Sequence, residues 1–421
     1  MNKVLIITYY WPPGSGAGVQ RWLKFTKYLP SMGWEPVILT VDPNYALYPA
    51  TDNSLVNDIP SNVRIYKTPA VNYFNFYSKE TSNVPSAGFA SGDDNIFKNK
   101  LFRFVRGNFF IPDPRRGWNR YAFRKAIEII NREKIKYVIT TSPPHSSQLI
   151  GLKLKRELPD IKWIADIRDP WTDIYYYSRF YPTPISRLID GNYEKQVLNS
   201  SDKIITVGKS LKQLFSEKIP GIDTKIEVIT NGFDEDDFAG FAAVNPATFT
   251  ISYIGTLSDA YPLDGLLSAM VAFRKARKDF RLRFIGTVSR HQRDLIILKA
   301  GIKPVEFVPH VDHASAIEYM ADTSALLLVI PDHPSNKSIV TGKLFEYIAS
   351  GKPVICIGPP DGDAAEIIAE SKAGRTFSYF DHKSLENYLF SISRNLSENK
   401  RVYLKYSRKD LARQLINILN E

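Results

Sequence analysis

The stretch Ser338-Ile-Val-Thr-Gly-Lys-Leu-Phe-Glu-Tyr-Ile-Ala-Ser-Gly-Lys-Pro-Val-Ile-Cys-Ile-Gly-Pro-Pro360 predicts a loop, a helix, a turn, a buried strand and a second turn. Apolar residues recur at helical spacing after Thr341, which is a suitable N-cap residue. Gly351 with Pro353 just beyond it is a typical helix stop. The apolar run at 354–357 then predicts a strand of a parallel sheet that is covered on both faces. This order of elements indicates an α/β fold.

Lys343 and Glu346 stand out from the apolar pattern because they lie three residues apart, on one face of the predicted helix. A lysine in the first turn opposes the helix dipole unless an anion is bound at the helix N-terminus. A carboxylate one turn further along can accept hydrogen bonds from two sugar hydroxyls. The pair therefore suits a nucleoside diphosphate, with its ribose at Glu346. An ordinary Lys/Glu pair on an amphipathic helix is the alternative.

Length and composition indicate two globular domains and an anionic partner. The 421 residues are enough for two domains of ordinary size, and the net charge of +11 favours a nucleotide-sugar, a phospholipid surface, a phosphorylated lipid or nucleic acid. No apolar run reaches the length of a membrane span, and the N-terminus reads as a strand rather than a signal peptide. We therefore expect a cytoplasmic protein. The single cysteine, Cys356, excludes an internal disulfide and a cysteine zinc site, and is predicted to be a buried thiol.

The N-terminus predicts a βαβ unit with a glycine-bearing loop, Trp11-Pro-Pro-Gly-Ser-Gly-Ala-Gly-Val19, after its first strand. Such loops hold phosphates or sugars in doubly wound domains, and a plain tight turn is the alternative. The loop is not a dinucleotide fingerprint, because the third glycine would fall on Val19. A P-loop is excluded at Gly342-Lys343, where Leu344 follows and the upstream glycine is missing.

Two further predicted strands are followed by polar residues, the first by Ser142-Pro-Pro-His145 and the second by Arg168-Asp-Pro-Trp171. Ligands of open α/β sheets gather at the carboxyl ends of strands. A neutral imidazole at His145 could hydrogen-bond a donor sugar or position an acceptor hydroxyl. Asp169 lies directly after the second of these strand ends. The alternatives are a histidine satisfied by turn hydrogen bonds, and an aspartate that starts a helix or pairs with Arg168.

Residues 42–120 form a long excursion with little periodicity, and 96–124 interleave basic and aromatic residues. That mixture suits contact with an anionic membrane, or a site for a lipid-diphosphate acceptor. A solvated basic helix whose aromatics fill the core is the alternative. We do not expect nucleic acid, because no recognition module accompanies the charge.

The run from Lys343 to Ile355 resembles the donor-binding segment of retaining, family-4-type glycosyltransferases of the GT-B fold. Helix, Gly-x-Pro-Val turn and strand match in order, and the Trp11–Val19 loop resembles that family's first loop with Ala17 in place of a glycine. The resemblance implies two Rossmann-like doubly wound domains facing a central cleft. Its expected boundaries are 1–232 for an acceptor-side domain, 233–248 for a linker, 249–395 for a donor domain and 396–421 for a helix that packs back on the first domain.

The resemblance also implies a set of site residues. Glu346 corresponds to the family's ribose-binding glutamate, and Pro309 and His310 to its base-contacting turn. Glu366 resembles the glutamate that follows the family's glycine turn, but a carboxylate that caps its helix explains it equally well. The implied donor-binding residues are Gly16, Gly18, Gly255, Thr256, Arg290, Pro309, His310, Ser338, Lys343, Leu344, Glu346 and Glu366, and the implied catalytic residues are His145 and Asp169.

The chain departs from the family pattern at two places. An Arg and a Lys that commonly neutralise the diphosphate are replaced here by Thr256 and Asp264, so Lys343 and Arg290 would have to supply that charge. The family often has a glutamate eight residues before Glu346, where this chain has Ser338.

These features together predict a retaining, metal-independent glycosyltransferase that needs no cofactor. Its substrates would be a nucleoside-diphosphate-sugar, with a UDP type favoured, and a glycan or lipid-linked acceptor of surface polysaccharide synthesis. It would be cytoplasmic, with peripheral contact at the inner face of the membrane through 96–124. The alternatives are a GT-B epimerase or phosphorylase, a nicotinamide-dependent Rossmann enzyme, and a non-catalytic nucleotide-sugar-binding or membrane-binding protein.

Overall fold

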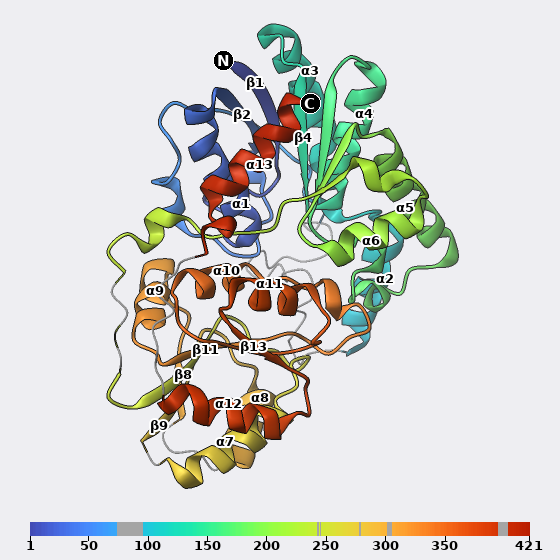
Figure 1. Ribbon diagram of the computed structural model, residues 1–421. Helices are drawn as coiled ribbons and strands as arrows, with labels where there is room; N and C mark the ends of the chain where they lie inside the picture. The colour runs from blue at the N-terminus through green and yellow to red at the C-terminus, as the bar shows by residue number, and fades with distance from the viewer. Residues whose placement is uncertain (74–95, 242–243, 245, 278, 301–304, 395–402) are drawn as a thin grey trace. The chain divides into compact units, whose positions relative to one another are not determined.

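The computed structural model describes residues 1–73, 96–241, 244, 246–277, 279–300, 305–394 and 403–421, and of 96–99 and 300 the backbone alone. The chain divides into two compact units. Unit 1 comprises Met1–Thr230 and Arg408–Glu421, and unit 2 comprises Asn231–Ser407. Each unit is a doubly wound α/β domain, so the predicted fold class of two Rossmann-like domains is confirmed (Figure 1).

Unit 1 contains a parallel sheet of seven strands in the order β3-β2-β1-β4-β5-β6-β7. Its strands are β1 (Asn2–Ile7), β2 (Trp34–Val41), β3 (Arg64–Thr68), β4 (Tyr137–Ser142), β5 (Lys162–Ile167), β6 (Lys203–Thr206) and β7 (Ile226–Val228). The order reverses between β1 and β4, which pair from Val4↔Tyr137 to Ile7↔Thr140. Ligands of such sheets bind outside the carboxyl ends of the strands at this reversal. The loops after β1 and β4 therefore meet at the place where a site is expected.

The strand period of two sends alternate side chains of unit 1 into separate cores. Val4 and Ile6 pack with helices α1 and α13, whereas Leu5 and Ile7 pack with α3 and α4. The α-helices of unit 1 are α1 (Ala17–Tyr28), α2 (Ile96–Phe109), α3 (Asn119–Glu133), α4 (Gln148–Glu157), α5 (Pro184–Ser200), α6 (Lys209–Lys218) and α13 (Arg408–Asn420). Both faces of the sheet are therefore covered, which explains its nearly continuous apolar strands.

Unit 2 repeats this topology with a parallel sheet in the order β10-β9-β8-β11-β12-β13. Its strands are β8 (Phe249–Ile254), β9 (Phe280–Ile285), β10 (Val305–Val308), β11 (Ala325–Val329), β12 (Val354–Ile357) and β13 (Gly374–Phe377). The order reverses between β8 and β11. The turn after β8, which begins at Gly255, therefore occupies the same topological position in unit 2 as the glycine-bearing loop after β1 does in unit 1.

The helices of unit 2 also lie on both faces of its sheet (Figure 1). They are α7 (Asp264–Ala276), α8 (Arg290–Ala300), α9 (His313–Ala321), α10 (Gly342–Ala349), α11 (Asp363–Ser371) and α12 (His382–Arg394). α7, α8 and α12 cover one face, and α9, α10 and α11 cover the other. Cys356 is buried in β12, where burial raises the pKa of its thiol to about 12, so the predicted buried thiol is confirmed.

The unit boundaries differ in detail from the expected domain limits. Unit 1 ends at Thr230, and the stretch expected to be a linker belongs to unit 2, where Phe233 is buried in the core beside α10. The last helix begins only at Arg408, and it packs against α1 within unit 1. Parts of the expected excursion (74–95), linker (242, 243 and 245) and terminal segment (396–402) lie outside the described residues.

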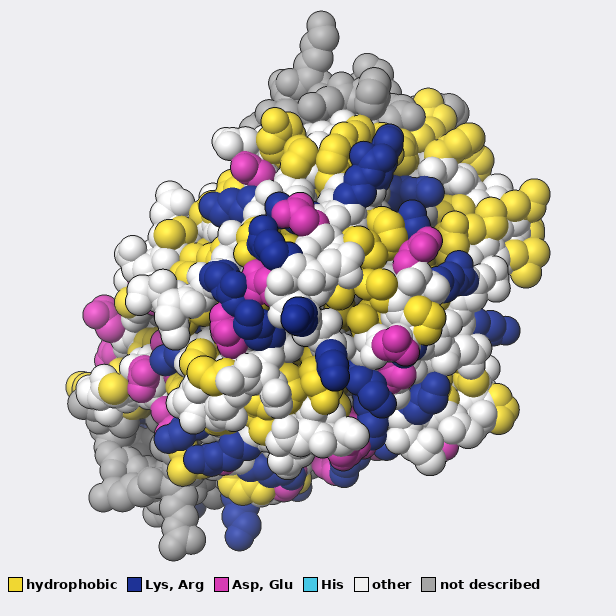
Figure 2. All heavy atoms as spheres, turned by 90° about the horizontal axis from the view of Figure 1, so that it is seen from above, with side chains coloured by type: hydrophobic (Ala, Val, Ile, Leu, Met, Phe, Trp, Pro, Cys, Tyr) yellow, Lys and Arg dark blue, Asp and Glu magenta, His cyan; other side chains and the backbone are white. Residues whose placement is uncertain are grey.

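None of the described helices is both long and apolar enough to cross a membrane. The face drawn in Figure 2 carries many dispersed Lys and Arg side chains, in keeping with the net charge of +11.

Candidate functional site

The glycine loop of unit 1 leads directly into the N-terminus of α1. Gly16 is the N-cap residue and has φ +101°, a backbone conformation that residues with a side chain rarely adopt. Its carbonyl accepts hydrogen bonds from the N–H groups of Val19 and Gln20, and no side chain caps the helix. The first-turn N–H groups that have no intrahelical partner make this terminus favourable for an anion.

Arg168, which follows β5, places its guanidinium against the second residue of α1. A methyl group added at Gly18 would lie 2.9 Å from Arg168 Nη2, so only glycine leaves room for this contact. Arg168 Nη2 lies 3.5 Å from the carbonyl oxygen of Pro143, in the turn after β4. The side chain is only 8% exposed, and its Nε lies 3.8 Å from Asp166 Oδ2 without making a hydrogen bond to any described residue. A fixed cation therefore lies at the helix N-terminus that the sequence pointed to.

Asp166 is a structural carboxylate that holds α1, β4 and β5 together. It is fully buried and accepts hydrogen bonds from Arg21 Nη2 (3.1 Å), Trp22 Nε1 (2.9 Å) and Thr141 Oγ1 (2.7 Å). Arg21 also donates to the carbonyl of Thr230 (2.7 Å). Because these donors already occupy it, this carboxylate is not available to a ligand.

His145 begins the short helix η6 (His145–Ser147) after β4, at the reversal of strand order. Its ring stacks on Trp171 with a centroid distance of 4.8 Å and an interplanar angle of 19°. Burial lowers the pKa of His145 to about 3, with a smaller effect from the positive charge of Arg168. The imidazole is thus neutral near pH 7, and its Nδ1 is buried without a partner. This geometry can exchange a hydrogen bond with a hydroxyl group.

Asp169 and Asp190 are two further carboxyl groups near this turn. Burial raises the pKa of Asp169, and Arg168 opposes that shift. Asp190 on α5 accepts hydrogen bonds from Trp171 Nε1 (2.7 Å) and Tyr177 O–H (3.0 Å). Burial raises the pKa of Asp190 to about 6. The hydrogen bond from Trp171 fixes the indole on which His145 stacks.

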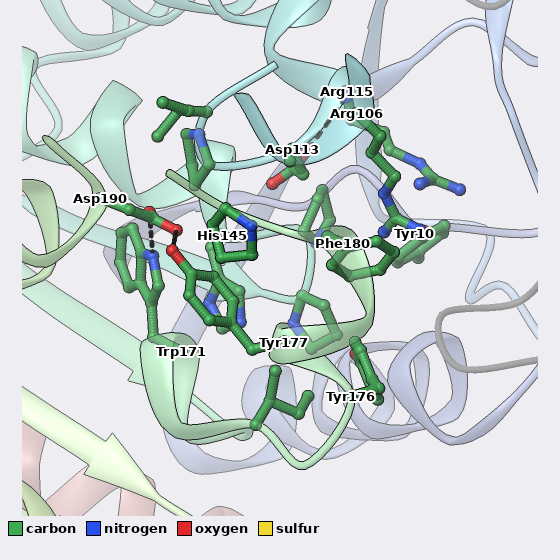
Figure 3. A pocket seen from close by; sticks show the side chains of 17 residues that line it. Tyr10, Arg106, Asp113, Arg115, His145, Trp171, Tyr176, Tyr177, Phe180 and Asp190 are labelled. Atoms are coloured by element: carbon green, nitrogen blue, oxygen red, sulfur yellow. Dashed lines mark hydrogen bonds between the residues drawn. The ribbon is translucent and has the colours of Figure 1, made fainter. Parts of the chain in front are cut away.

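A pocket opens beside His145, entirely within unit 1 (Figure 3). Its volume is about 70 Å³. The labelled side chains show two contrasting ends: Arg106 and Arg115 lie with Tyr10 at one end, and Asp190 lies with Trp171 and Tyr177 at the other. The sequence pattern had not indicated that α2, the turn after β4 and the start of α5 would share one pocket.

In unit 2, Lys343 of α10 reaches the carboxyl end of β8. Its Nζ donates to the hydroxyl of Tyr253 (2.9 Å) and to the carbonyl of Ile254 (3.3 Å), and it lies 4.0 Å from the centroid of the Tyr253 ring. Gly255 has φ +126°, and a methyl group there would lie 3.2 Å from Lys343 Nζ. Burial lowers the pKa of Lys343 to about 7, and Glu346 counteracts that shift.

Glu346 lies one helical turn beyond Lys343 and contacts His313, the first residue of α9. Its Oε1 is 3.1 Å from His313 Nε2, and the two side chains are 20% and 26% exposed. The carboxylate therefore remains accessible to a ligand. The sequence pattern had singled out His310 in this region rather than His313, because a contact between α9 and α10 leaves no local spacing signal.

The N-terminus of α10 shows one difference from the expected cap. Thr341 occupies the N-cap position, but its side chain makes no capping hydrogen bond and its Oγ1 is buried without a partner. Leu344 is fully buried in the core, and its N–H donates to the carbonyl of Thr341, so its side chain is not open to a ligand. Ser338 ends the short helix η11 (Asn336–Ser338), and its Oγ donates to the carbonyl of Ser335.

The other expected donor residues lie at exposed positions at the ends of strands or the starts of helices. Thr256 follows Gly255, and its carbonyl accepts from the Tyr253 hydroxyl (2.7 Å). The turn after β9 lies against the Gly255 turn, because Leu257 N–H donates to the Thr287 carbonyl. Thr256 follows β8, Arg290 begins α8, and Glu366 lies in the first turn of α11. Pro309 and His310 are the first two residues after β10. All five residues are exposed.

Within the described residues, no three His, Cys, Asp or Glu side chains are grouped so as to hold a metal ion. The notable groups of the two units are instead Arg168 and His145 in unit 1, and Lys343 and Glu346 in unit 2. Each group lies where the strand order of its own sheet reverses or on the helix beside that point. An anion and a set of hydroxyl groups are the ligands that this chemistry suits.

Comparison with known proteins agrees with this geometry. Residues 18–237, more than half of the chain, match the model of "Glycosyltransferase Family 4", and residues 248–395 match the model of "Glycosyl transferases group 1". The chain therefore belongs to glycosyltransferase family 4, and the resemblance inferred from the sequence is confirmed. No curated protein matches the chain at a significant level.

Solved structures share the fold over the whole chain. A glycosyltransferase from Rickettsia africae is 17% identical, with a TM-score of 0.60 and coverage of 99% of this chain and 97% of that one. Anabaena HepE in complex with UDP is 12% identical, with a TM-score of 0.60 and full coverage of both chains. A putative UDP-N-acetylglucosamine 2-epimerase from Listeria monocytogenes is 11% identical, with a TM-score of 0.56 and coverage of 99% and 95%. These similarities establish the GT-B fold, which is common to transferases and epimerases.

Proposed function

We propose that this glycosyltransferase moves a sugar from a UDP-type nucleotide-sugar to a glycan or lipid-linked acceptor, with retention of anomeric configuration and without a metal ion. Family membership supports a transferase, and the UDP held by the structural neighbour HepE supports a uridine nucleotide. A role in surface polysaccharide synthesis is part of the same proposal and rests on the resemblance of the donor-binding segment.

The arrangement of Lys343 against Gly255 is the observation that carries the proposal. The ammonium lies at the turn after β8, beside a glycine whose missing side chain keeps the turn open. The unpartnered Thr341 Oγ1 at the N-terminus of the same helix adds a hydrogen-bond donor. A diphosphate would bind this set of groups, and Glu346 would accept hydrogen bonds from the ribose one turn further along α10.

The charge normally supplied by two other cations must come from elsewhere in this chain. Asp264, at one of those positions, pairs with Lys299 (2.6 Å), and Thr256 is uncharged. Lys343 in unit 2 and Arg168 in unit 1 are cations that lie close to glycine residues at ligand-binding strand ends. Because the departing diphosphate carries the negative charge, Lys343 beside a diphosphate held at the Gly255 turn would stabilise the transition state directly.

His145 suits a hydrogen-bonding role rather than an acid–base role. Its pKa of about 3 leaves the ring neutral, and the unpartnered Nδ1 can bind a hydroxyl of the transferred sugar or of the acceptor. The transition state of glycosyl transfer resembles an oxocarbenium ion, so stabilisation of the leaving group can carry much of the catalysis.

Nucleotide binding tests the donor site. We expect UDP and UDP-sugars to raise the melting temperature of the protein more than the matching GDP, ADP and CDP compounds, because a ligand that binds only the folded state stabilises it. Glu346→Gln should weaken this shift, whereas Glu318→Gln, an exposed glutamate on α9, should leave it unchanged. Absence of a shift with every nucleotide would contradict the proposal, and consumption of the sugar nucleotide without any acceptor would favour an epimerase.

An apolar surface with cations at its margin supports peripheral contact with an anionic membrane. Asn108 joins α2 to the start of α5, because its side chain donates to the Tyr181 carbonyl and accepts from Ser186. The large exposed hydrophobic residues on these adjoining elements, which we call the apolar surface, are Leu101, Phe104, Phe109, Tyr181, Ile185, Leu188 and Ile189.

The charges beside the apolar surface are complementary to anionic lipids. Lys100, Arg179 and Arg187 are exposed there, and no exposed side chain at 100–109 or 177–190 is acidic. Such a combination of apolar groups and cations is typical of membrane-surface attachment. The later part of the expected segment 96–124 is not available for this contact. Trp118 is fully buried and donates to Thr68 Oγ1, and Arg115 is buried as well.

A further inference from the structure

The pocket beside His145 has an end where two arginines meet, which we call the arginine end. Arg106 comes from α2, and Arg115 comes from the short helix η5 (Pro114–Trp118). They are close enough for the charge of Arg115 to lower the pKa of Arg106, which burial brings to about 10. Both guanidinium groups therefore remain protonated near pH 7, and they repel one another.

The described residues compensate the charge of Arg106 only in part. Arg106 lies over the ring of Phe180, 3.9 Å from its centroid, and makes no hydrogen bond or ion pair with any described residue. The carboxylate nearest to the arginines in sequence, Asp113, already accepts from the N–H and hydroxyl of Ser146 (2.8 and 2.9 Å) and from the N–H of Arg115 (2.9 Å). The cation–π contact orients Arg106 but leaves its N–H donors without acceptors among the residues that the structure describes.

The opposite end of the pocket offers groups of another kind. Trp171 and Tyr177 are fixed by Asp190, and His145 presents its unpartnered Nδ1 (Figure 3). Aromatic faces with a few fixed hydrogen-bonding groups are typical of sites that orient a small polar ligand. The pocket therefore pairs an anion-binding end with an end suited to hydroxyl groups.

We propose that this pocket binds a phosphate group attached to a sugar, with the phosphate on Arg106 and Arg115 and the sugar hydroxyls toward His145. Arginine is suited to this role because its planar fork of N–H donors matches phosphate oxygens. The volume of about 70 Å³ corresponds to the space of about five water molecules, which suits a phosphate with part of one sugar ring. The assignment of that sugar phosphate to the acceptor substrate rests on the proposed transferase function.

Titration calorimetry of the full-length protein with glucose 1-phosphate, inorganic phosphate and inorganic pyrophosphate tests the pocket. Arg106→Met keeps the stem on Phe180 and removes the charge, so we expect binding of glucose 1-phosphate to weaken about tenfold or more. Arg103→Met removes an arginine three residues earlier on α2 that does not line the pocket, and should change binding less than twofold. Arg106→Lys, which keeps the charge but loses the fork, should give an intermediate affinity.

Further measurements distinguish this pocket from the proposed donor site, and distinguish a sugar phosphate from inorganic phosphate or a lipid headgroup. Lys343→Met should leave glucose 1-phosphate binding unchanged, because Lys343 does not line this pocket. The proposal for the pocket can therefore hold even if no nucleotide binds to unit 2. Equal losses in Arg106→Met and Arg103→Met, or a loss only in Lys343→Met, would overturn the proposal. Inorganic phosphate binding as tightly as glucose 1-phosphate would overturn the sugar part. If Arg106→Met abolished binding to phosphatidylglycerol vesicles but not to glucose 1-phosphate, the pocket would be a lipid headgroup site instead.

Discussion

Units 1 and 2 share the order of their first six strands but place different kinds of charge at the reversal of strand order. Each has a glycine with positive φ after its first strand, Gly16 in unit 1 and Gly255 in unit 2. Beside these turns lie Arg168 in unit 1 and Lys343 in unit 2. An arginine stays protonated in proteins, whereas a lysine changes its charge readily when it is buried. The comparison shows that one topology can hold a permanent cation in one domain and a titratable one in the other.

The largest expected effect is on the free energy of unfolding, where losing a buried carboxylate of unit 1 should cost far more than losing an exposed one of unit 2. Asp166→Ala would leave Arg21 buried without its carboxylate partner, and breaking such a pair costs about 3–5 kcal/mol of unfolding free energy. Asp361→Ala removes an exposed carboxylate of unit 2 that pairs with Lys337, and should change the unfolding free energy far less, because solvent screens a pair of this kind. Urea denaturation followed by circular dichroism measures both. Similar midpoints for the two variants would show that Asp166 is not the structural carboxylate that its contacts indicate.

The next largest effect should fall on catalysis in unit 2. Lys343→Met removes the ammonium beside Gly255, and we expect the turnover rate to fall about 100-fold, as it does when one group that stabilises transition-state charge is lost. Lys337→Met, an exposed lysine of the same unit, serves as the control and should retain activity. The measurement is release of UDP from the UDP-sugar in the presence of acceptor. Turnover within threefold of the wild type for Lys343→Met would remove this residue from the mechanism.

A smaller effect should test the proposed contact of unit 1 with an anionic membrane. Leu188→Glu places a carboxylate in the apolar surface of unit 1, and we expect sedimentation with phosphatidylglycerol vesicles to fall several-fold. Leu298→Glu, at a comparably exposed leucine of α8 in unit 2, is the matched control. Equal loss in the two variants would mean that net charge, rather than this surface, governs vesicle binding.

The smallest effect is a proton taken up when the donor binds. With a pKa of about 7, Lys343 is mostly neutral at pH 8, and a neighbouring diphosphate should raise that pKa, so binding of a UDP-sugar should take up nearly one proton. Calorimetry in buffers of different ionisation enthalpy measures this uptake, which should vanish in Lys343→Met. No uptake by the wild-type protein at pH 8 would show that Lys343 does not contact the phosphates.

The lowered pKa of Lys343 also makes the unfolding free energy of the protein without ligand depend on pH. The pKa of Lys343 is lower in the folded protein than its ordinary value of 10.5, so the folded state binds fewer protons between about pH 7 and 10.5. The penalty for burying the charged amine is complete below pH 7 and is relieved as the pH rises through that window. The stability gained by Lys343→Met should therefore be greater at pH 6 than at pH 10.

Local sequence patterns were sufficient for the features that lie within one short stretch. Lys343 and Glu346 are on one face of α10 because a helix brings residues three apart together. The strand ends at His145 and Asp169 were recognisable because polar residues follow apolar runs. The contacts of these residues were not predictable in the same way: Tyr253 and His313 lie far from α10 in the sequence.

The sequence by itself determined two doubly wound domains, the glycine turns and a lysine–glutamate helix, because each depends on residue spacing or backbone freedom over a few residues. Only the tertiary structure decided which groups meet. It brought Arg106, Arg115 and Asp190 to one pocket, placed Arg168 against Gly18, and buried Lys343 deeply enough to lower its pKa. Burial and the proximity of charges depend on how distant segments pack, and no local spacing encodes them.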